Sequence, residues 1–369
     1  MVVDGLSLRD FRGYRDARVA LGGGLTVVSG PNGAGKTNLL EALYFGCTGR
    51  SCRTANEREV VRFGAPTTRV VVRCSGEDGA HELAVGFTPG EPKRMRVDGA
   101  PVERLLDVAD RPLVSVFLPD RLELIKGPPG LRRAHLDQLV AALWPARAAT
   151  RKAFVQALAQ RNALLGRIRA GGGSADSLAT WDLQLARHGI ALMEDRAEAA
   201  GALERPFTTF AGSLGLDQEP TLSYRPRSRA AEPEQLAAEL AERRPGDLER
   251  GFTGHGPHRD ELTLLREGRE LRTFGSQGQQ RLALLALLLA ERQVIAQRRG
   301  STPLMLLDDV MSELDHERRD ALVDLLRTSG GQAVITTTDL EHVPGIEDPD
   351  VKRLPLAAGH RLEERVAVA

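Results

Sequence analysis

The sequence predicts an α/β fold, with a mixed β-sheet core and an antiparallel β part, interrupted by an inserted lobe of short antiparallel helices. Three observations support this prediction. Short apolar strands alternate with helical patterns near both ends of the chain, whereas the middle third is helical almost throughout. Hairpin signals follow one another in the first hundred residues. The length of 369 residues is sufficient for two domains or lobes.

The first hundred residues are expected to be mostly β, with one helix. Leu25–Ser29 (LTVVS) is a β-branched apolar strand that ends in a glycine-rich turn, and a helix begins near Thr37. Asp-Gly pairs between apolar runs then predict two hairpins. Their strands are 70–74 with 82–87, and 95–97 with 101–102.

The middle of the chain is predicted to be helical at 131–144, 146–170, 177–204 and 232–244. Pro145 ends the first helix, and Gly171-Gly172-Gly173-Ser174 breaks the chain between the second and third. Two antiparallel helices of about 25 residues would each be roughly 37 Å long, which is a short arm and not a long coiled coil.

The β/α alternation returns after residue 251. We expect strands at 261–265, 304–307 and 333–337, and helices at 279–298 and 313–326. The predicted organisation is therefore one lobe made from 1–125 and 251–369, with the helical lobe at 126–250 inserted into it.

Composition excludes several classes of protein. The 50 basic and 50 acidic residues balance, and 41% of the chain is hydrophobic. These values exclude a disordered charged chain, and they exclude DNA binding through bulk charge, so nucleic-acid contacts must come from local basic clusters.

Cysteine content and hydropathy bear on the compartment. Cys47, Cys52 and Cys74 form no C-x-x-C pair, which favours a reducing compartment over a disulfide framework or zinc site. The charged N-terminus is not typical of a signal peptide, and the longest apolar run, 282–290, is far below the roughly 20 residues of a membrane span. We expect a cytoplasmic protein without membrane contact.

The turn after the first predicted strand matches G-x-x-x-x-G-K-[ST], in the strand–turn–helix context that this phosphate-binding motif requires. Its residues are Gly30, Pro31, Asn32, Gly33, Ala34, Gly35, Lys36 and Thr37. Glycines let backbone N–H groups face the phosphates, and the helix N-terminus adds positive partial charge. We expect Lys36 to bridge the β- and γ-phosphates and Thr37 to bind Mg²⁺. The alternative is a glycine-rich turn with a solvated lysine.

A second motif is the apolar strand 304–307, which runs into Asp308 and Asp309. Adjacent carboxylates at a buried strand end are costly unless a cation or hydrogen bonds meet them. We expect this strand to lie beside the phosphate-loop strand, so that Asp308 holds Mg²⁺ and Asp309 orients or deprotonates the attacking water. The alternative is a strand that ends in a polar turn.

Several motifs resemble those of ABC-type ATPases. SQGQQ at 276–280 resembles their signature motif, and LLDDVMSELD at 306–315 resembles their Walker B motif and D-loop, which ends at Asp315. The opening LSLRDFRGY is similar to SMC- and Rad50-like members. With TGRSCRT (48–54), FLPDRLELIKGPPGLRRAHLD (117–137) and GPHRDEL (256–262) in the same order, residues 6–340 resemble the RecF family of bacterial DNA replication and repair proteins.

This resemblance implies an ABC-type ATPase head that binds ATP and Mg²⁺ and forms a homodimer with ATP. The signature residues would receive the γ-phosphate of the nucleotide held by the other subunit, and they are Ser276, Gln277, Gly278 and Gln279. Asp315 and Thr338 are expected near the nucleotide, and Arg12 is expected either on its phosphates or on the surface.

Three departures from the ABC pattern suggest slow hydrolysis. Thr338 stands where these ATPases carry a His, Asp309 replaces their usual Glu, and the strand 113–118 ends without their usual Gln. The resemblance therefore implies a weak, DNA-stimulated ATPase that acts as a switch.

The resemblance also implies the ligands and partners. The implied DNA ligands are double-stranded DNA, gapped DNA and single-/double-strand junctions. The implied protein partners are RecR, with RecO and RecA. The implied processes are recombinational repair, replication and the SOS response to DNA damage. Aromatic residues make up only 4% of the chain, which favours contact with a duplex backbone over base stacking. Candidate basic clusters, each otherwise a solvated face, are Arg50 and Arg53; Lys126, Arg132 and Arg133; and Arg225, Arg227 and Arg229.

Other interpretations stay open. A transporter ATPase would lack the long insertion and would carry the missing His and Gln, and an SMC- or Rad50-like chromosome-maintenance ATPase would carry longer helices. His255 and His258, three residues apart, suggest a metal site, a rigid turn with hydrogen-bonded histidines, or part of the nucleotide site.

Overall fold

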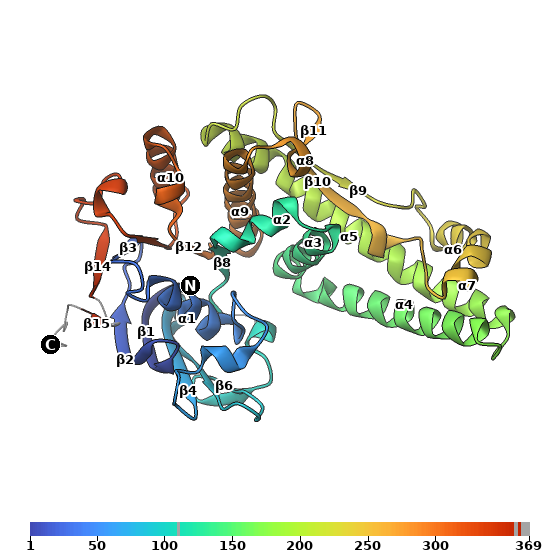
Figure 1. Cartoon of the computed structure of the whole chain (residues 1–369), viewed down its shortest axis with the longest axis horizontal. Helices are drawn as coiled ribbons and strands as arrows, with labels where there is room; N and C mark the ends of the chain where they lie inside the picture. The colour runs from blue at the N-terminus through green and yellow to red at the C-terminus, as the bar shows by residue number, and fades with distance from the viewer. Residues whose placement is uncertain (109–110, 358–360, 363–369) are drawn as a thin grey trace. The chain divides into compact units, whose positions relative to one another are not determined.

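The computed structural model describes residues 1–108, 111–357 and 361–362, which fold as two compact units (Figure 1). Unit 1 is formed by Met1–Arg121 and by the chain from Ile295 onward, and unit 2 is Leu122–Val294. Residues 251–294, which we expected in the ATPase lobe, lie in unit 2. They do so because strand β10 (Glu261–Arg266) pairs with β9 (Thr221–Arg225), a strand that the sequence analysis did not anticipate.

The first sheet of unit 1 carries the predicted phosphate loop. Its strand order is β15-β14-β3-β13-β12-β8, in which five strands are parallel and the edge strand β15 is antiparallel. The bounds are β3 Leu25–Ser29, β8 Val114–Phe117, β12 Leu304–Leu307, β13 Ala333–Thr337, β14 Lys352–Ala357 and β15 Arg361–Leu362. Strands β3, β12 and β13 have the predicted bounds and are buried along their whole length, as parallel strands covered on both faces are.

The strand order corrects one expectation. Strand β13 pairs with both β3 and β12, so the strand that carries Asp308 is not beside the phosphate-loop strand. Hydropathy shows which segments are strands, but the order within a parallel sheet depends on crossover connections that hydropathy does not encode.

The second sheet of unit 1 is antiparallel, with the order β2-β1-β4-β5-β6-β7. The bounds are β1 Val2–Phe11, β2 Tyr14–Ala20, β4 Thr68–Gly76, β5 Gly79–Phe87, β6 Arg94–Val97 and β7 Ala100–Val102. Both predicted hairpins are present, and Asp98 and Gly99 have φ values of +51° and +81°, as the type I′ turn between β6 and β7 requires. Apolar side chains from the inner face pack with Leu39, Leu40 and Leu43 of α1 (Lys36–Thr48) in one core.

Helix α10 (His316–Thr328) completes the regular helices of unit 1 and begins later than the predicted residue 313. Val310–Glu313 form a 3₁₀ turn, and the Asp315 side chain caps α10 by accepting a hydrogen bond from the Arg318 amide at 3.0 Å. The other 3₁₀ turns of this unit are Glu57–Val60, Leu105–Asp107, Pro119–Leu122, which ends one residue inside unit 2, and Leu340–His342.

Unit 2 is mainly helical, with α4 and α5 side by side along its length (Figure 1). Its helices are α2 Glu123–Lys126, α3 Pro129–Leu143, α4 Ala148–Arg169, α5 Leu178–Ser213, α6 Pro233–Glu242, α7 Arg244–Arg250, α8 Leu271–Phe274 and α9 Gln277–Arg299, whose last residues belong to unit 1. The third strand of its sheet is β11 Arg269–Glu270, and its remaining 3₁₀ turns are Pro145–Arg147, Ala175–Ser177 and Pro257–Arg259.

Helix α5 runs beyond its predicted end at residue 204 and contains Pro206. Proline removes one helical hydrogen bond, but continuing the helix buries Phe207 and Phe210, which outweighs that loss.

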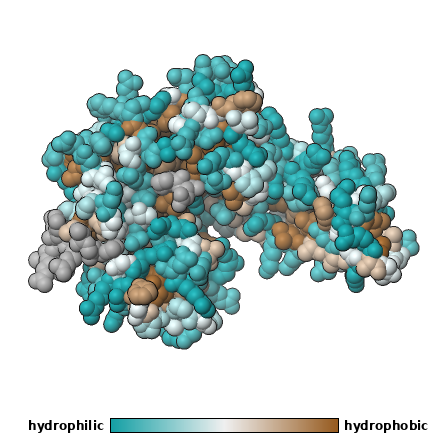
Figure 2. All heavy atoms as spheres, viewed as in Figure 1, coloured by the Kyte–Doolittle hydropathy of each residue, from teal (hydrophilic) through white to brown (hydrophobic). Residues whose placement is uncertain are grey.

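Hydrophilic residues cover most of the face seen in Figure 2, where apolar residues form small separate patches. Among the helices that the structure describes, none is both long enough and apolar enough to cross a membrane.

A buried ion-pair network joins three helices of unit 2. Arg161 of α4 is fully buried and donates hydrogen bonds to Asp182 of α5 at 2.7 Å, to Asp247 of α7 at 2.8 Å and to Thr253 at 2.8 Å. A buried charge is tolerated only where such partners replace water, so removing one member leaves the others unpaired.

Replacing this arginine should therefore destabilise unit 2. We expect Arg161→Ala to lower the free energy of unfolding by about 3–5 kcal/mol, because two carboxylates lose their buried partner. Urea denaturation followed by circular dichroism measures the change. The control is Arg167→Ala on the exposed side of the same helix, for which we expect a change below about 0.5 kcal/mol. Equal stabilities of the two variants would contradict the network's role.

Candidate nucleotide-binding site

The phosphate loop connects β3 to α1 through glycines that no other residue can replace without strain. A Cβ atom on Gly30 would lie 2.4 Å from the carbonyl oxygen of Leu356. Gly33 and Gly35 have φ values of +80° and +101°, in the region that side chains disfavour. Gly35 is the N-cap of α1 and offers no side-chain cap, so the N–H groups of the first turn are available to an anion.

Lys36 is folded back onto this loop. Its Nζ donates hydrogen bonds to the carbonyl oxygens of Gly30 at 2.8 Å and Pro31 at 3.1 Å. Burial lowers the pKa of Lys36, while the charges of Asp309 and Asp308 act in the opposite direction. The ammonium group therefore lies within the electrostatic reach of both predicted Walker B carboxylates.

The carboxylate of Asp308 connects three segments of the chain. Thr37 Oγ1, at the start of α1, donates to it at 2.8 Å, and Thr336 Oγ1, on β13, donates to it at 2.7 Å. The intervening strand β13 thus supplies the second hydroxyl. Thr37 and Asp308, the two predicted Mg²⁺ ligands, lie in direct contact, and their oxygens are the ligand type that Mg²⁺ prefers.

Asp309, the predicted catalytic acid, is held in a strained conformation. Its φ of +48° is unusual for a residue with a side chain. Its amide donates to Thr336 Oγ1 at 2.9 Å, and its Oδ2 accepts from Ser312 Oγ at 3.0 Å. Its Oδ1 is buried and accepts no hydrogen bond from the described residues. Strain combined with an unpartnered buried oxygen is typical of a functional group that awaits a ligand.

Arg12 is held by a buried carboxylate that the sequence analysis did not identify. Arg12 donates two hydrogen bonds, at 2.8 and 2.7 Å, to Glu41 on α1, whose side chain is fully buried. Arg53 donates to Glu41 at 3.2 Å and to Asn38 at 3.1 Å, and Ser51 donates to Glu41 at 2.5 Å. Both arginines therefore lie along the first turns of α1. An isolated acid within the apolar run LLEALYF was the available sequence signal.

The signature residues lie in unit 2, at the N-terminus of α9. The amide of Ser276 donates to Gln279 Oε1 at 2.8 Å, and the amide of Gln279 donates to Ser276 Oγ at 3.3 Å, which is a capping box. Ser276, Gln277 and Gly278 are exposed. The start of α9 therefore presents a hydroxyl and backbone amides to solvent.

Two other predicted site residues do not contact the Asp308 carboxylate. Asp315 caps α10 and pairs with Arg318 at 2.7 Å, and Thr338 is exposed just after β13. Of the threonines at the end of β13, Thr336 contacts the Walker B carboxylate.

Each of the two histidines has a hydrogen-bonding partner, as expected if they belong to a rigid turn. His255 Nε2 lies 2.5 Å from a Glu239 carboxylate oxygen, and His258 Nε2 donates to the Thr253 carbonyl at 2.9 Å. Burial lowers the pKa of His258 to about 4, so it is neutral at physiological pH. Within the described part of the chain, no three His, Cys, Asp or Glu residues gather as a metal site.

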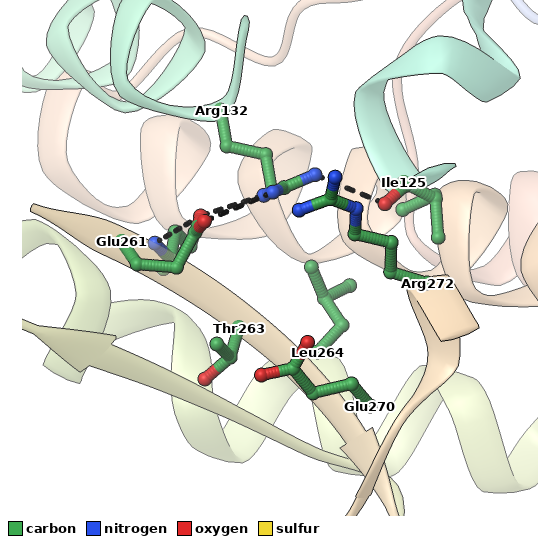
Figure 3. A pocket seen from close by; sticks show the side chains of 8 residues that line it. Ile125, Arg132, Glu261, Thr263, Leu264, Glu270 and Arg272 are labelled. Atoms are coloured by element: carbon green, nitrogen blue, oxygen red, sulfur yellow. Dashed lines mark hydrogen bonds and ion pairs between the residues drawn. The ribbon is translucent and has the colours of Figure 1, made fainter. Parts of the chain in front are cut away.

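One member of a candidate basic cluster, Arg132, is buried inside unit 2. Arg132 is almost fully buried, pairs with Glu261 at 2.8 Å and donates to the carbonyl of Ile125 at 3.0 Å. Figure 3 shows Arg132 and Arg272 at the pocket that these groups line. The guanidinium of Arg132 is committed to internal partners and cannot reach a DNA backbone.

Several known proteins are similar to this chain. A family model described as an AAA domain matches residues 6–93, which include the phosphate loop. The chain is 38% identical to the DNA replication and repair protein RecF of Anaeromyxobacter sp. (strain Fw109-5), over 94% of each chain. A solved structure of the recombination mediator protein RecF with ATP, in the RecFOR pathway, matches with a TM-score of 0.85 and 26% identity, over 98% of this chain and 97% of that one. An SMC head bound to a domain of ScpA shares the fold, with a TM-score of 0.59 at 16% identity, over 97% of this chain and 95% of that one.

The fold and the phosphate loop define an ATPase head of the ABC and SMC type. Within that class, the chain belongs to the RecF family of DNA replication and repair proteins. The predicted fold class and family are confirmed, and family membership decides against the transporter alternative.

The buried Glu41 generates a stability prediction. We expect Glu41→Gln to lower the free energy of unfolding by about 2–4 kcal/mol, because Arg12 and Arg53 lose their shared counter-charge in a buried setting. The matched control is Glu59→Gln, since Glu59 is half exposed and lies 3.9 Å from Arg12. It should change stability by less than about 0.5 kcal/mol. Thermal unfolding of both variants measures the difference, and a Glu41→Gln variant as stable as Glu59→Gln would contradict it.

Proposed function

We propose that this chain is an ATP-dependent DNA-binding protein that hydrolyses ATP slowly and uses the nucleotide as a switch. The observation that supports this best is the convergence of Thr37, Thr336 and Asp308, with the unpartnered oxygen of Asp309 next to them. It forms at the C-terminal ends of parallel strands and at a helix N-terminus, where phosphates are bound in α/β proteins.

Each residue has a definite task in this proposal. Lys36 exchanges the loop carbonyls for phosphate oxygens, and the open amides of the first turn of α1 bind the same phosphates. Thr37 and Asp308 would hold Mg²⁺, and the bound cation would neutralise phosphate charge. Asp309 uses its free Oδ1 to orient the attacking water.

The exposed N-terminus of α9 supports a homodimer. A serine hydroxyl and open amides at a helix N-terminus form a receptor for a phosphate, and here they face solvent. In the proposal they contact the γ-phosphate held by a second copy, with Gln277, Gly278 and Gln279 beside Ser276 and with Asp315 and Thr338 near the same nucleotide. ATP then contributes binding energy to the dimer, and hydrolysis removes it.

The proposed hydrolysis is slow and responds to DNA. Asp309 is a shorter acid than the glutamate of most ABC ATPases, and Thr338 cannot act as their histidine does. The proposed ATPase therefore acts as a slow switch and not as a motor. The proposed DNA ligands are duplexes with gaps or single-strand junctions. The similar solved structures are of RecF in the RecFOR pathway, so the proposed partners are RecR, with RecO and RecA, in the cytoplasm.

The dimer generates the sharpest test of this function. Sedimentation velocity with saturating ATP should show a dimer for the wild type and a monomer for Lys36→Met, which cannot bind the phosphates. Ser276→Arg should bind ATP with wild-type affinity yet remain a monomer, because the arginine fills the phosphate receptor. The control is Ser174→Arg, the same change at an exposed loop position, which should dimerise normally. A Ser276→Arg variant that dimerises like the wild type would contradict the proposal.

A further inference from the structure

The antiparallel sheet of unit 1 has one buried face and one solvent-facing face. Side chains alternate along each strand, so Val70 and Val72 of β4 point into the core while Arg69 and Arg73 point to solvent. The same alternation holds on β1, β2 and β6. Six exposed arginines share the outer face, which we call the arginine face: Arg9, Arg18, Arg69, Arg73, Arg94 and Arg96.

The strand register brings these arginines together across the sheet. Arg9 of β1 lies directly opposite Arg69 of β4, and Gly86, the next residue in that row, lies opposite Arg94 of β6. Two like charges directly opposite one another on neighbouring strands are destabilising in the absence of an anion. The sheet thus retains an unfavourable pair that a bound polyanion would relieve.

Carboxylates neutralise this face only in part. Asp16 lies directly opposite Arg9, and Glu82 lies directly opposite Arg73. With Asp4 at the bulge of β1 and Glu91 beside Arg94, the face has four acids to six arginines. Among the described residues, the guanidinium groups of Arg9, Arg18, Arg69 and Arg73 form no hydrogen bond or ion pair, and that of Arg94 pairs only with the exposed Glu91. The chain as a whole has no net charge, so this excess is local.

The arrangement of the arginine face suits contact with the backbone of a nucleic acid and not with its bases. Uncharged residues such as Ser7 and Val71 lie between arginines on the outer face, and Gly5 leaves room for the Arg73 side chain, which lies within 4 Å of where a Cβ would be. The strands of this sheet carry no tyrosine, phenylalanine or tryptophan on the outer face, because Phe11, Tyr14 and Phe87 are buried, so these strands offer bases no ring to stack on. Arg69 and Arg73 are four residues apart, or roughly 14 Å along a strand. That spacing is close to the roughly 12 Å width of a DNA major groove, which phosphates line on both sides.

We propose that the arginine face is a binding surface for the phosphate backbone of duplex DNA. The choice of DNA as the polyanion rests on the proposed function, while the surface itself follows from register, exposure and charge. Contacts of this kind position a duplex without reading its sequence. The arginine face replaces the buried Arg132 as a DNA-contacting candidate.

The test compares three triple variants by fluorescence anisotropy with a labelled 30-base-pair duplex and saturating ATP. In the first, Arg9→Gln, Arg69→Gln and Arg73→Gln remove three charges from the face. In the second, the same positions become Lys and keep the charge. The third, called the off-sheet variant, is the matched control. In it Arg104→Gln, Arg327→Gln and Arg353→Gln remove three charges from unit 1 outside the antiparallel sheet, and each of these arginines has an acidic partner. Thermal unfolding and ATP affinity are measured for every variant.

The proposal predicts that the face-Gln variant binds the duplex at least 10-fold more weakly than wild type. Its slope of log affinity against log salt should also be smaller in magnitude by about 2–3, because three phosphate contacts are lost. The Lys and off-sheet variants should bind within about 3-fold of wild type.

Two results would overturn this proposal, and a third would contradict the proposed function instead. A face-Gln variant that folds, binds ATP and binds the duplex like wild type would overturn this proposal, even if it lost affinity for an acidic partner protein. Equal losses in the face-Gln and off-sheet variants would overturn it too, because they would indicate a bulk-charge effect. A wild type that binds no duplex at all would instead contradict the proposed function.

Discussion

The hydrogen bonds to the Asp308 carboxylate are the constraint on which the nucleotide site depends. They join Thr37 on α1, Thr336 on β13 and the end of β12, so one buried acid links segments that are 271 residues apart in sequence. A buried carboxylate costs several kcal/mol unless donors replace its water, and two hydroxyl groups do so here. The same interaction places the predicted Mg²⁺ ligands side by side before any ligand arrives.

The placement of β13 explains the unusual state of Asp309. Thr336 Oγ1 donates to the Asp308 carboxylate and accepts the Asp309 amide, so one hydroxyl orients both acids. This double contact supports the left-handed backbone conformation of Asp309. In this conformation the Oδ1 atom of Asp309 is buried and has no hydrogen-bonding partner among the described residues. Strain at the predicted catalytic position is thus stabilised by the strands that hold Asp309.

Local features of the site could be predicted from sequence, and long-range ones could not. The phosphate loop, β3, β12, β13 and the two hairpins depend on short-range patterns, and each appears where it was expected. The strand order, the extension of α5 past Pro206 and the role of Glu41 depend on which residues meet in space. The arginine face is a similar case, because Arg9 and Arg69 are 60 residues apart and only the register brings them together.

The most direct test of this account is the Mg²⁺ dependence of ATP binding, measured by isothermal titration calorimetry with and without Mg²⁺. The account predicts that Mg²⁺ raises the ATP affinity of the wild type at least 10-fold, and that Asp308→Asn removes this increase while ATP without Mg²⁺ still binds. Thr336→Val should retain part of the increase, because Asp308 then keeps one of its two donors. An Asp308→Asn variant with the full Mg²⁺-dependent increase would contradict the central role of this carboxylate.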